Sequence, residues 1–163
     1  MPSMQYDVKS THAAANGVMI PFRTRLKGIV WMPYAQVTEH STLVNNKSIS
    51  TTYARAATVC TITTPKPHGL FVGAGVFLDF AAGGPTDDYY IVKTIPTPTT
   101  FTVTVANSGD TSGDVVLWDD VLFHMDSVTE IAIQIPIPGE GILAPDGIRV
   151  FLGADMHVSV FYG

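Results

Sequence analysis

Short apolar runs broken by turn residues follow one another along the whole chain. The clearest are residues 115–118, 130–135, 147–152 and 157–162, where apolar side chains alternate with polar ones or run on without a break. Runs of this length, rich in Val, Ile, Tyr and Phe, are typical of β-strands. No stretch shows a convincing helical pattern. The sequence therefore predicts an all-β protein.

Turn signals suggest how these strands are arranged. Candidate strands at 25–31 and 100–105 are set off by clusters of Gly, Pro, Asn and Asp, at the spacing of about 8 to 12 residues that is typical of sandwiches and barrels. Three Pro-rich segments, at 65–67, 96–98 and 136–138, are expected in loops or at sheet edges, because proline cannot donate a hydrogen bond to a central ladder.

The middle of the chain differs in composition from its two ends. Residues 51–118 are dense in Thr, Gly and Pro, whereas residues 1–50 and 119–163 each hold an incomplete set of strands. Because a stable sheet needs about three or more strands, the two flanks are expected to pair with each other. We predict a β-sandwich or barrel-like outer domain, with a small β-barrel or sandwich module inserted into it.

Composition narrows the function classes. Only 14% of the 163 residues are charged, against about 25% in typical proteins, so we expect something else to cover part of the surface. The net charge is −5 and the nine basic residues are scattered, which argues against nucleic acid as a partner. No signal-peptide pattern or membrane-spanning run occurs, so no membrane partner is expected. The single cysteine, Cys60, has no intrachain partner and fits folding in a reducing cytosol.

The chain offers little that resembles catalytic or metal-binding chemistry. Gly-x-Ser-x-Gly is absent, Gly73-Ala74-Gly75 lacks the phosphate-binding fingerprint, and the carboxylates in Asp87-Asp88 and Asp119-Asp120 point to opposite strand faces. We expect no enzyme activity and no cofactor. A carbohydrate-active enzyme stays the weakest alternative, which a pocket holding two carboxylates at catalytic separation would support.

The histidines also lack a metal-site spacing. His124 beside Asp126, and His157 beside Asp155, share strand faces and suggest acid–base work, but structural roles are favoured. A metal site assembled by the fold from three histidines stays an alternative. The five histidines are His12, His40, His68, His124 and His157.

Two polar loops and several aromatic residues are candidate contact groups. Residues 83–88 read as a hairpin loop rather than a calcium loop, and residues 107–114 as a mobile polar loop. Their candidate contacts are Asp87, Asp88, Asn107 and Asp110. Aromatic residues are enriched at interfaces, although each can equally fill a core. The candidates are Phe22, Trp31, Tyr34, Phe161 and Tyr162, with residues 1–15 as an arm laid on a partner.

The middle of the chain resembles a known small β-module. The similarity is carried by His68-Gly69-Leu70-Phe71-Val72-Gly73, Val76-Phe77-Leu78, Asp88-Tyr89-Tyr90-Ile91-Val92 and Pro98-Thr99-Thr100-Phe101-Thr102-Val103. This module is often compared with the first catalytic-cysteine half-domain of ubiquitin-activating enzymes and recurs in phage tail and virion proteins. The resemblance implies a scaffold and no chemistry, and Cys60 lies outside the matching residues.

The flanks resemble small virion proteins of tailed phages. The phrases that carry this similarity are Tyr6-Asp7-Val8-Lys9-Ser10, Arg23-Thr24-Arg25-Leu26-Lys27-Gly28-Ile29, Ile137-Pro138-Gly139-Glu140-Gly141-Ile142, Ile148-Arg149-Val150 and Val158-Ser159-Val160-Phe161-Tyr162-Gly163. The resemblance implies a capsid decoration or cement protein, trimeric, bound to the major capsid protein or another virion protein. The alternative is a tail or head-fibre component whose inserted module binds host-surface carbohydrate.

Overall fold

The chain forms two compact units. The computed structural model describes residues 8–34, 39–127 and 131–163. One unit, the outer sandwich, combines residues 1–47 with 122–163, and the other, the inserted module, is residues 48–121. The junctions expected from the sequence, before residue 51 and after residue 118, differ from these bounds by three residues each.

All regular structure in the described ranges is β-strand, which confirms the all-β class and its sandwich or barrel-like character. No helix in these ranges has the length and hydropathy needed to cross a membrane. The strands of the outer sandwich are β1 (Lys9–Ala13), β2 (Gly17–Ile20), β3 (Thr24–Pro33), β4 (Glu39–Asn45), β12 (Val121–Ser127), β13 (Ile133–Pro136), β14 (Ile142–Ala144), β15 (Ile148–Leu152) and β16 (Met156–Tyr162). Those of the inserted module are β5 (Ile49–Ala56), β6 (Val59–Thr63), β7 (Gly75–Phe80), β8 (Asp88–Ile91), β9 (Thr94–Thr97), β10 (Thr100–Thr104) and β11 (Ser112–Trp118).

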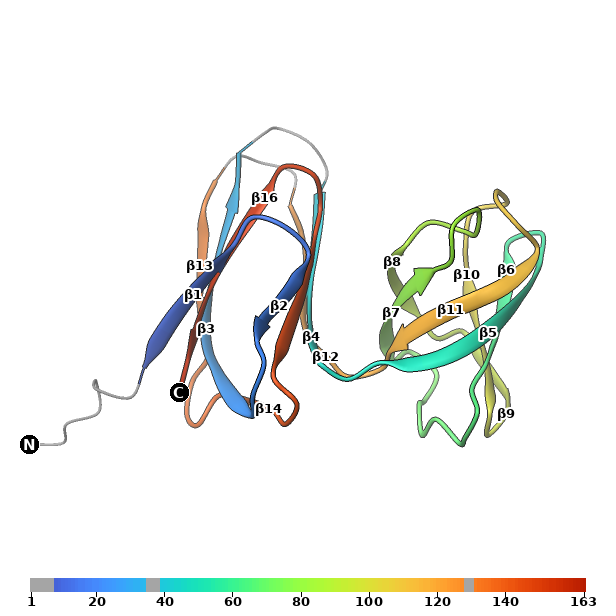
Figure 1. The fold of residues 1–163 in the computed structure, drawn as a ribbon, viewed down its shortest axis with the longest axis horizontal. Coiled ribbons are helices and arrows are strands. Elements are labelled where there is room, and N and C mark those ends of the chain that lie inside the picture. The colour runs from blue at the N-terminus through green and yellow to red at the C-terminus, as the bar shows by residue number, and fades with distance from the viewer. Residues whose placement is uncertain (1–7, 35–38, 128–130) are drawn as a thin grey trace, which may run out of the picture. The chain divides into compact units, whose positions relative to one another are not determined.

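The outer sandwich buries its core between two sheets, which face each other in Figure 1. One has the order β1-β16-β3-β13, with β14 also paired to β3, and the other has the order β12-β4-β15-β2. Each sheet mixes strands from both ends of the chain: Trp31 of β3 lies opposite Val158 of β16, and Val44 of β4 opposite Arg149 of β15. Neither flank holds enough strands to form these sheets alone.

The inserted module is one sheet of seven strands that curls on itself. Its order is β8-β7-β11-β5-β6-β10-β9. The two outermost strands, β8 and β9, are consecutive in the chain, and the two residues between them bond to other strands. The Val92 amide donates to the carbonyl of Ala74 at 2.9 Å, and the Lys93 amide donates to that of Thr102 at 2.8 Å. The result is a half-barrel that encloses its own core.

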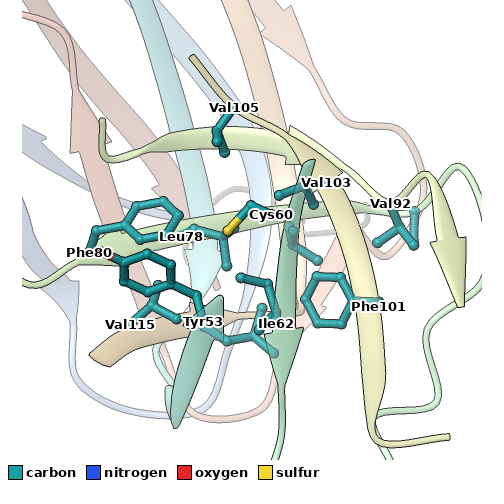
Figure 2. Packing of buried hydrophobic residues seen from close by; sticks show 13 residues of the cluster. Tyr53, Cys60, Ile62, Leu78, Phe80, Val92, Phe101, Val103, Val105 and Val115 are labelled. Atoms are coloured by element: carbon teal, nitrogen blue, oxygen red, sulfur yellow. The ribbon is translucent and has the colours of Figure 1, made fainter. Parts of the chain in front are cut away.

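Along the strands of the module, alternate side chains point inward and fill that core. Figure 2 shows the side chains of Tyr53, Cys60, Ile62, Leu78 and Phe101 gathered inside the curled sheet. The chain enters on β5 and leaves on β11, which are neighbouring antiparallel strands with Ile49 opposite Leu117. Adjacent entry and exit strands are what an insertion into a loop requires.

One proline from each of two Pro-rich segments lies at a sheet edge, as expected for a residue that cannot donate a backbone hydrogen bond. Pro96 lies in β9 and Pro136 ends β13, and both are edge strands of their sheets. The strand expected at 130–135 is observed as Ile133–Pro136, and residue 130 lies outside the described residues. Residues 1–7 of the expected N-terminal arm also lie outside them, while residues 9–13 form β1, paired with β16.

A polar groove on the inserted module

The inserted module has a hollow of about 580 Å³ on the side of its sheet that faces away from the core. Side-chain alternation along β5 explains why the hollow lies on this side of the sheet. Thr51 and Tyr53 point into the core and are buried, whereas Ser50 and Thr52 point to the opposite side and are exposed. Four consecutive strands of the sheet, β7, β11, β5 and β6, contribute lining residues. We call this hollow the polar groove.

Strand register brings the lining side chains together in two rows. Val116 of β11 lies opposite both Asp79 of β7 and Ser50 of β5. Two residues back on β11, Asp114 lies opposite Thr52 of β5. Thr52 is in turn opposite Thr63 of β6. Because residues i and i+2 of a strand share a face, both rows face the same side of the sheet.

The polar side chains of these two rows have no hydrogen-bonding partner in the part of the chain that the structure describes. Neither carboxylate, of Asp79 or Asp114, has a hydrogen bond or ion pair among the described residues, and the same holds for the hydroxyls of Ser50, Thr52 and Thr63. The neighbouring inward threonines differ. Thr51 donates to the carbonyl of Val115 at 2.8 Å, and Thr64 donates to that of Lys66 at 2.6 Å. The groove therefore presents hydrogen-bonding groups that the fold itself does not use.

The four loop residues expected as contacts accept hydrogen bonds within the module. Asp87 Oδ1 accepts the Phe80 amide at 2.6 Å, and Asp88 Oδ1 accepts the amide of the next residue at 2.7 Å. Asn107 Oδ1 accepts from Arg55 Nη1 at 2.6 Å. The carbonyl of Asp110 accepts from Arg55 Nε at 3.4 Å. These interactions hold the two loops in place, and none of the four residues lines the groove.

Burial raises the pKa of the Asp87 carboxyl, while its hydrogen bond from the Phe80 amide lowers it and the negative charge of Asp79 raises it further. Burial also raises the pKa of the Cys60 thiol to about 11. Since Cys60 has no exposed surface and stays a thiol at neutral pH, it is not an accessible nucleophile.

The aromatic candidates divide into buried and exposed groups. Trp31 is 0% exposed between the two sheets of the outer sandwich, so it is a core residue and the interface prediction for it is wrong. Phe22 is 52% exposed and Tyr34 57% exposed, and the Tyr34 hydroxyl donates to the carbonyl of Ala154. Phe161 and Tyr162 are half-buried on β16. Tyr162 and Phe22 have ring centroids 6.2 Å apart.

The structure assembles one polar cluster that the sequence signalled only through His124 and Asp126. On β4 and β12, the Thr42 hydroxyl lies 2.9 Å from His124 Nδ1, and His124 Nε2 lies 3.2 Å from Asp126 Oδ1. His40 Nδ1 contacts the same carboxylate oxygen at 3.0 Å. A hydroxyl, an imidazole and a carboxylate in this order resemble a hydrolase triad. Thr42 is only 1% exposed, however, so its hydroxyl cannot reach a substrate and the cluster ties two strands together.

Metal chemistry finds no support in the described part of the chain, where no group of three His, Cys, Asp or Glu side chains is arranged to hold an ion. Several strongly exposed apolar residues are not among the contact candidates expected from the sequence. Phe71 and Val72, in the loop between β6 and β7, are 70% and 61% exposed. Ile131 and Ile133, at 65% and 38%, lie before and within edge strand β13.

These features define an all-β protein of two units with a surface groove suited to binding. No protein-family model matches the chain, and no curated protein matches it. Among solved structures it is similar to "Phage phi92 endosialidase", with 21% sequence identity and a TM-score of 0.31, over 84% of this chain and 21% of that chain. The chain thus spans about a fifth of that protein's length. A TM-score this low transfers neither fold nor function, and the two resemblances read from the sequence stay predictions.

Proposed function

We propose that the protein is a structural component of a phage virion, a decoration protein that binds the major capsid protein on the outer surface of the head. The sequence resemblances of the module and the flanks support a virion role. The structural observation that carries the proposal is the apolar edge of the outer sandwich at β13. A decoration role needs no catalysis and no cofactor.

The β13 edge has the features of an association surface. Within the described residues 8–34, 39–127 and 131–163, β13 pairs with β3 on one side only, and no described strand pairs with its other side. Ile133 within this strand and Ile131 before it expose apolar side chains there. An unpaired strand with apolar side chains is a template for another strand, and soluble proteins usually block it with charge. In this protein, we expect a neighbouring subunit of a trimer to cover the edge.

Strand addition at this edge would bury the isoleucines and satisfy the free backbone groups of β13 in one step. Because bound protein stabilises the lattice by mass action, many weak contacts of this kind would reinforce the head. The exposed Phe22 and Tyr34 would then supply further contacts to the capsid surface.

The test combines capsid binding with oligomeric state. Purified protein is added to phage heads that lack it, and occupancy is scored by cryo-electron microscopy, while sedimentation measures the free protein. We expect a trimer that fills regular lattice positions, and a variant carrying Ile131→Lys and Ile133→Lys that sediments as a monomer with occupancy reduced at least about tenfold. A wild-type protein that leaves the heads bare would overturn the proposal.

Val59→Lys is the matched control for this experiment. Val59 is 50% exposed, but its strand β6 is paired on both sides within the module. The same change from an apolar to a charged side chain should therefore leave both trimer and occupancy unchanged. Equal losses for Val59→Lys and the β13 variant would show that general surface hydropathy, and not the β13 edge, drives binding.

The second candidate is a tail or head-fibre component whose inserted module binds host-surface carbohydrate. The observation that favours it is the polar groove, in which two carboxylates and three hydroxyls have no side-chain hydrogen bond or ion pair among the described residues. Saturable binding to host cells, with no occupancy of the head, would support this function over decoration.

A further inference from the structure

We infer that the polar groove is a binding site for a neutral oligosaccharide, held by the carboxylates of Asp79 and Asp114 and by the hydroxyls of Ser50, Thr52 and Thr63. The inference deepens the carbohydrate-binding function proposed above by assigning its residues and its class of ligand. It does not depend on whether the protein decorates a head or belongs to a fibre.

The dimensions of the groove suit a short chain of sugars. Its volume, about 580 Å³, lies within the range of about 300 to 1,000 Å³ that is typical of small-molecule sites. The four strands that line it follow one another in the sheet, as Figure 1 shows for β7, β11, β5 and β6. At about 4.8 Å between neighbouring strands, the groove extends for about 14 Å across them. An elongated ligand lying across the strands fits this shape.

The lining chemistry matches a ligand rich in hydroxyl groups. Carboxylates accept hydrogen bonds from sugar hydroxyls, and charge-assisted bonds of this type are about twice as strong as neutral ones. Ser and Thr hydroxyls both donate and accept, as sugar hydroxyls do. Most of the exposed lining surface is apolar and includes Val116, Ala81 and Pro65, on which the C–H faces of sugar rings can rest.

Charge excludes acidic glycans. No lysine or arginine is among the residues that line the groove, so a ligand carboxylate, sulphate or phosphate would meet no counter-charge. It would instead meet two aspartates, in a protein whose net charge is already −5. Like charges at short range repel by about 1 kcal/mol or more even in high dielectric, so the oligosaccharide should be uncharged.

Other occupants fit less well. A peptide that adds to a sheet needs an unpaired strand edge, whereas β11 and β5, at the centre of the groove, are paired on both sides. A calcium ion takes six or more oxygen ligands, usually from several carboxylates. Among the described residues the groove supplies two carboxylates, and no three-residue metal cluster exists.

The test is a glycan array probed with the full-length protein, followed by calorimetric titration of the glycans that bind, in buffer with and without EDTA. We expect neutral oligosaccharides to bind in both buffers, and sialylated or sulphated ones to give no signal. Asp114→Ala and Thr63→Val should each weaken the titrated affinity at least about tenfold. Thermal unfolding checks that both variants remain folded.

Thr61→Val provides the matched control. Thr61 lies on the same strand and the same face as Thr63, but it does not line the groove. Its substitution should leave affinity unchanged. Four results would overturn the inference: no neutral glycan bound, acidic glycans preferred, binding abolished by EDTA, or equal effects at Thr61 and Thr63.

The glycan-binding test and the capsid-binding test can succeed or fail independently of each other. Capsid occupancy of Asp114→Ala is measured in the assay described above and should equal that of the wild type, because the groove and the β13 edge belong to different units. Loss of glycan binding with full occupancy supports both assignments. A wild type that occupies heads but binds no glycan defeats only the groove assignment, and the reverse pattern defeats only decoration.

Discussion

The outer sandwich and the inserted module bury their cores in different ways. The sandwich places two sheets face to face, and each sheet needs strands from both ends of the chain. The module curls one sheet built from residues 49–118, a continuous stretch. Folding of the sandwich therefore depends on contacts between distant residues, whereas the module contains all of its own partners. The difference shows why an insertion at this point leaves both cores complete.

The two units also differ in how they use polar side chains. In the sandwich, the cluster of Thr42, His124, Asp126 and His40 is closed, because its members bond to one another. In the module, Asp79, Asp114, Ser50, Thr52 and Thr63 of the groove have no side-chain hydrogen bond or ion pair among the described residues. We therefore expect polar ligand binding in the module, and association through apolar surface in the sandwich.

The largest expected effect comes from separating the units. Replacing residues 48–121 by a short Gly-rich turn should leave a folded sandwich, because both of its sheets remain complete. Ending the chain after residue 121 should abolish the sandwich, which loses β12 beyond its first residue and all of β13 to β16, but should leave the module folded. Dispersion of amide signals in nuclear magnetic resonance spectra distinguishes these states.

A module that unfolds in the chain ending at residue 121 would show that it depends on the sandwich. The intact protein, recorded under the same conditions, supplies the reference positions for the signals of each unit.

Large core side chains should give the next largest effects. Trp31 and Phe101 are both 0% exposed, one in each core. Replacing either by alanine should cost about 3 to 5 kcal/mol. The loss should be confined to the unit that holds the residue, since the two cores are separate clusters. Urea unfolding followed by amide hydrogen exchange resolves the two units.

Phe71→Ala is the control for these substitutions. Phe71 is 70% exposed in a loop of the module, so its removal should change stability by less than about 0.5 kcal/mol. An equal loss in both units from Trp31→Ala or Phe101→Ala would show that they unfold as one cooperative body.

Local patterns predicted the strands because alternation is a property of neighbouring residues. The expected strands at 25–31, 147–152 and 157–162 overlap β3, β15 and β16 almost completely. The same patterns could not separate buried from exposed aromatics. Trp31 lies on the inward face of a central strand, whereas Phe22 lies in a connection outside the strands, and the residue type alone does not distinguish these positions.

The groove could not be predicted from local sequence patterns, because it depends on how distant strands pair. Asp79 and Asp114 reach one face only because β7 and β11 pair with Val116 opposite Asp79, and register between strands is not written in either strand alone. Asn107 looked like a free loop residue because its partner, the Arg55 guanidinium, is distant in the chain, and the partner of Asp87 is a main-chain amide of β7, which no sequence pattern marks. Turn composition identified the loops but not their internal bonds.

A smaller effect is expected from opening the closed cluster of the sandwich. His124→Ala removes the bonds to Thr42 and Asp126 and leaves the buried Thr42 hydroxyl without this partner. The sandwich should lose about 1 to 2 kcal/mol, and the module none. Urea unfolding of the two units measures both values.

His12→Gln is the matched control for this substitution, since His12 bonds Ser159 on an exposed face. Its effect should stay within about 0.5 kcal/mol. A His124→Ala variant as stable as the wild type would mean that the cluster contributes nothing to the sandwich.

The smallest expected effect concerns the pH dependence of the module. Burial raises the pKa of Asp87 in the folded state, so the folded module binds the proton more tightly than the unfolded chain does. The stabilisation that this proton gives is present below the unfolded pKa and is lost as the pH rises through the folded pKa. Asp87→Asn keeps an oxygen acceptor for the Phe80 amide and never ionises.

The Asp87→Asn variant should therefore match the wild type at low pH and exceed its stability at neutral pH, as measured by urea unfolding at each pH. Asp87→Ala removes the acceptor as well and should be less stable than the wild type at low pH, where charge plays no part. If Asp87→Asn were instead less stable at neutral pH, the hydrogen bond from Phe80 to the ionised carboxylate would outweigh the cost of burying the charge. The comparison of the two substitutions thus separates the charge of Asp87 from its role as an acceptor in the loop.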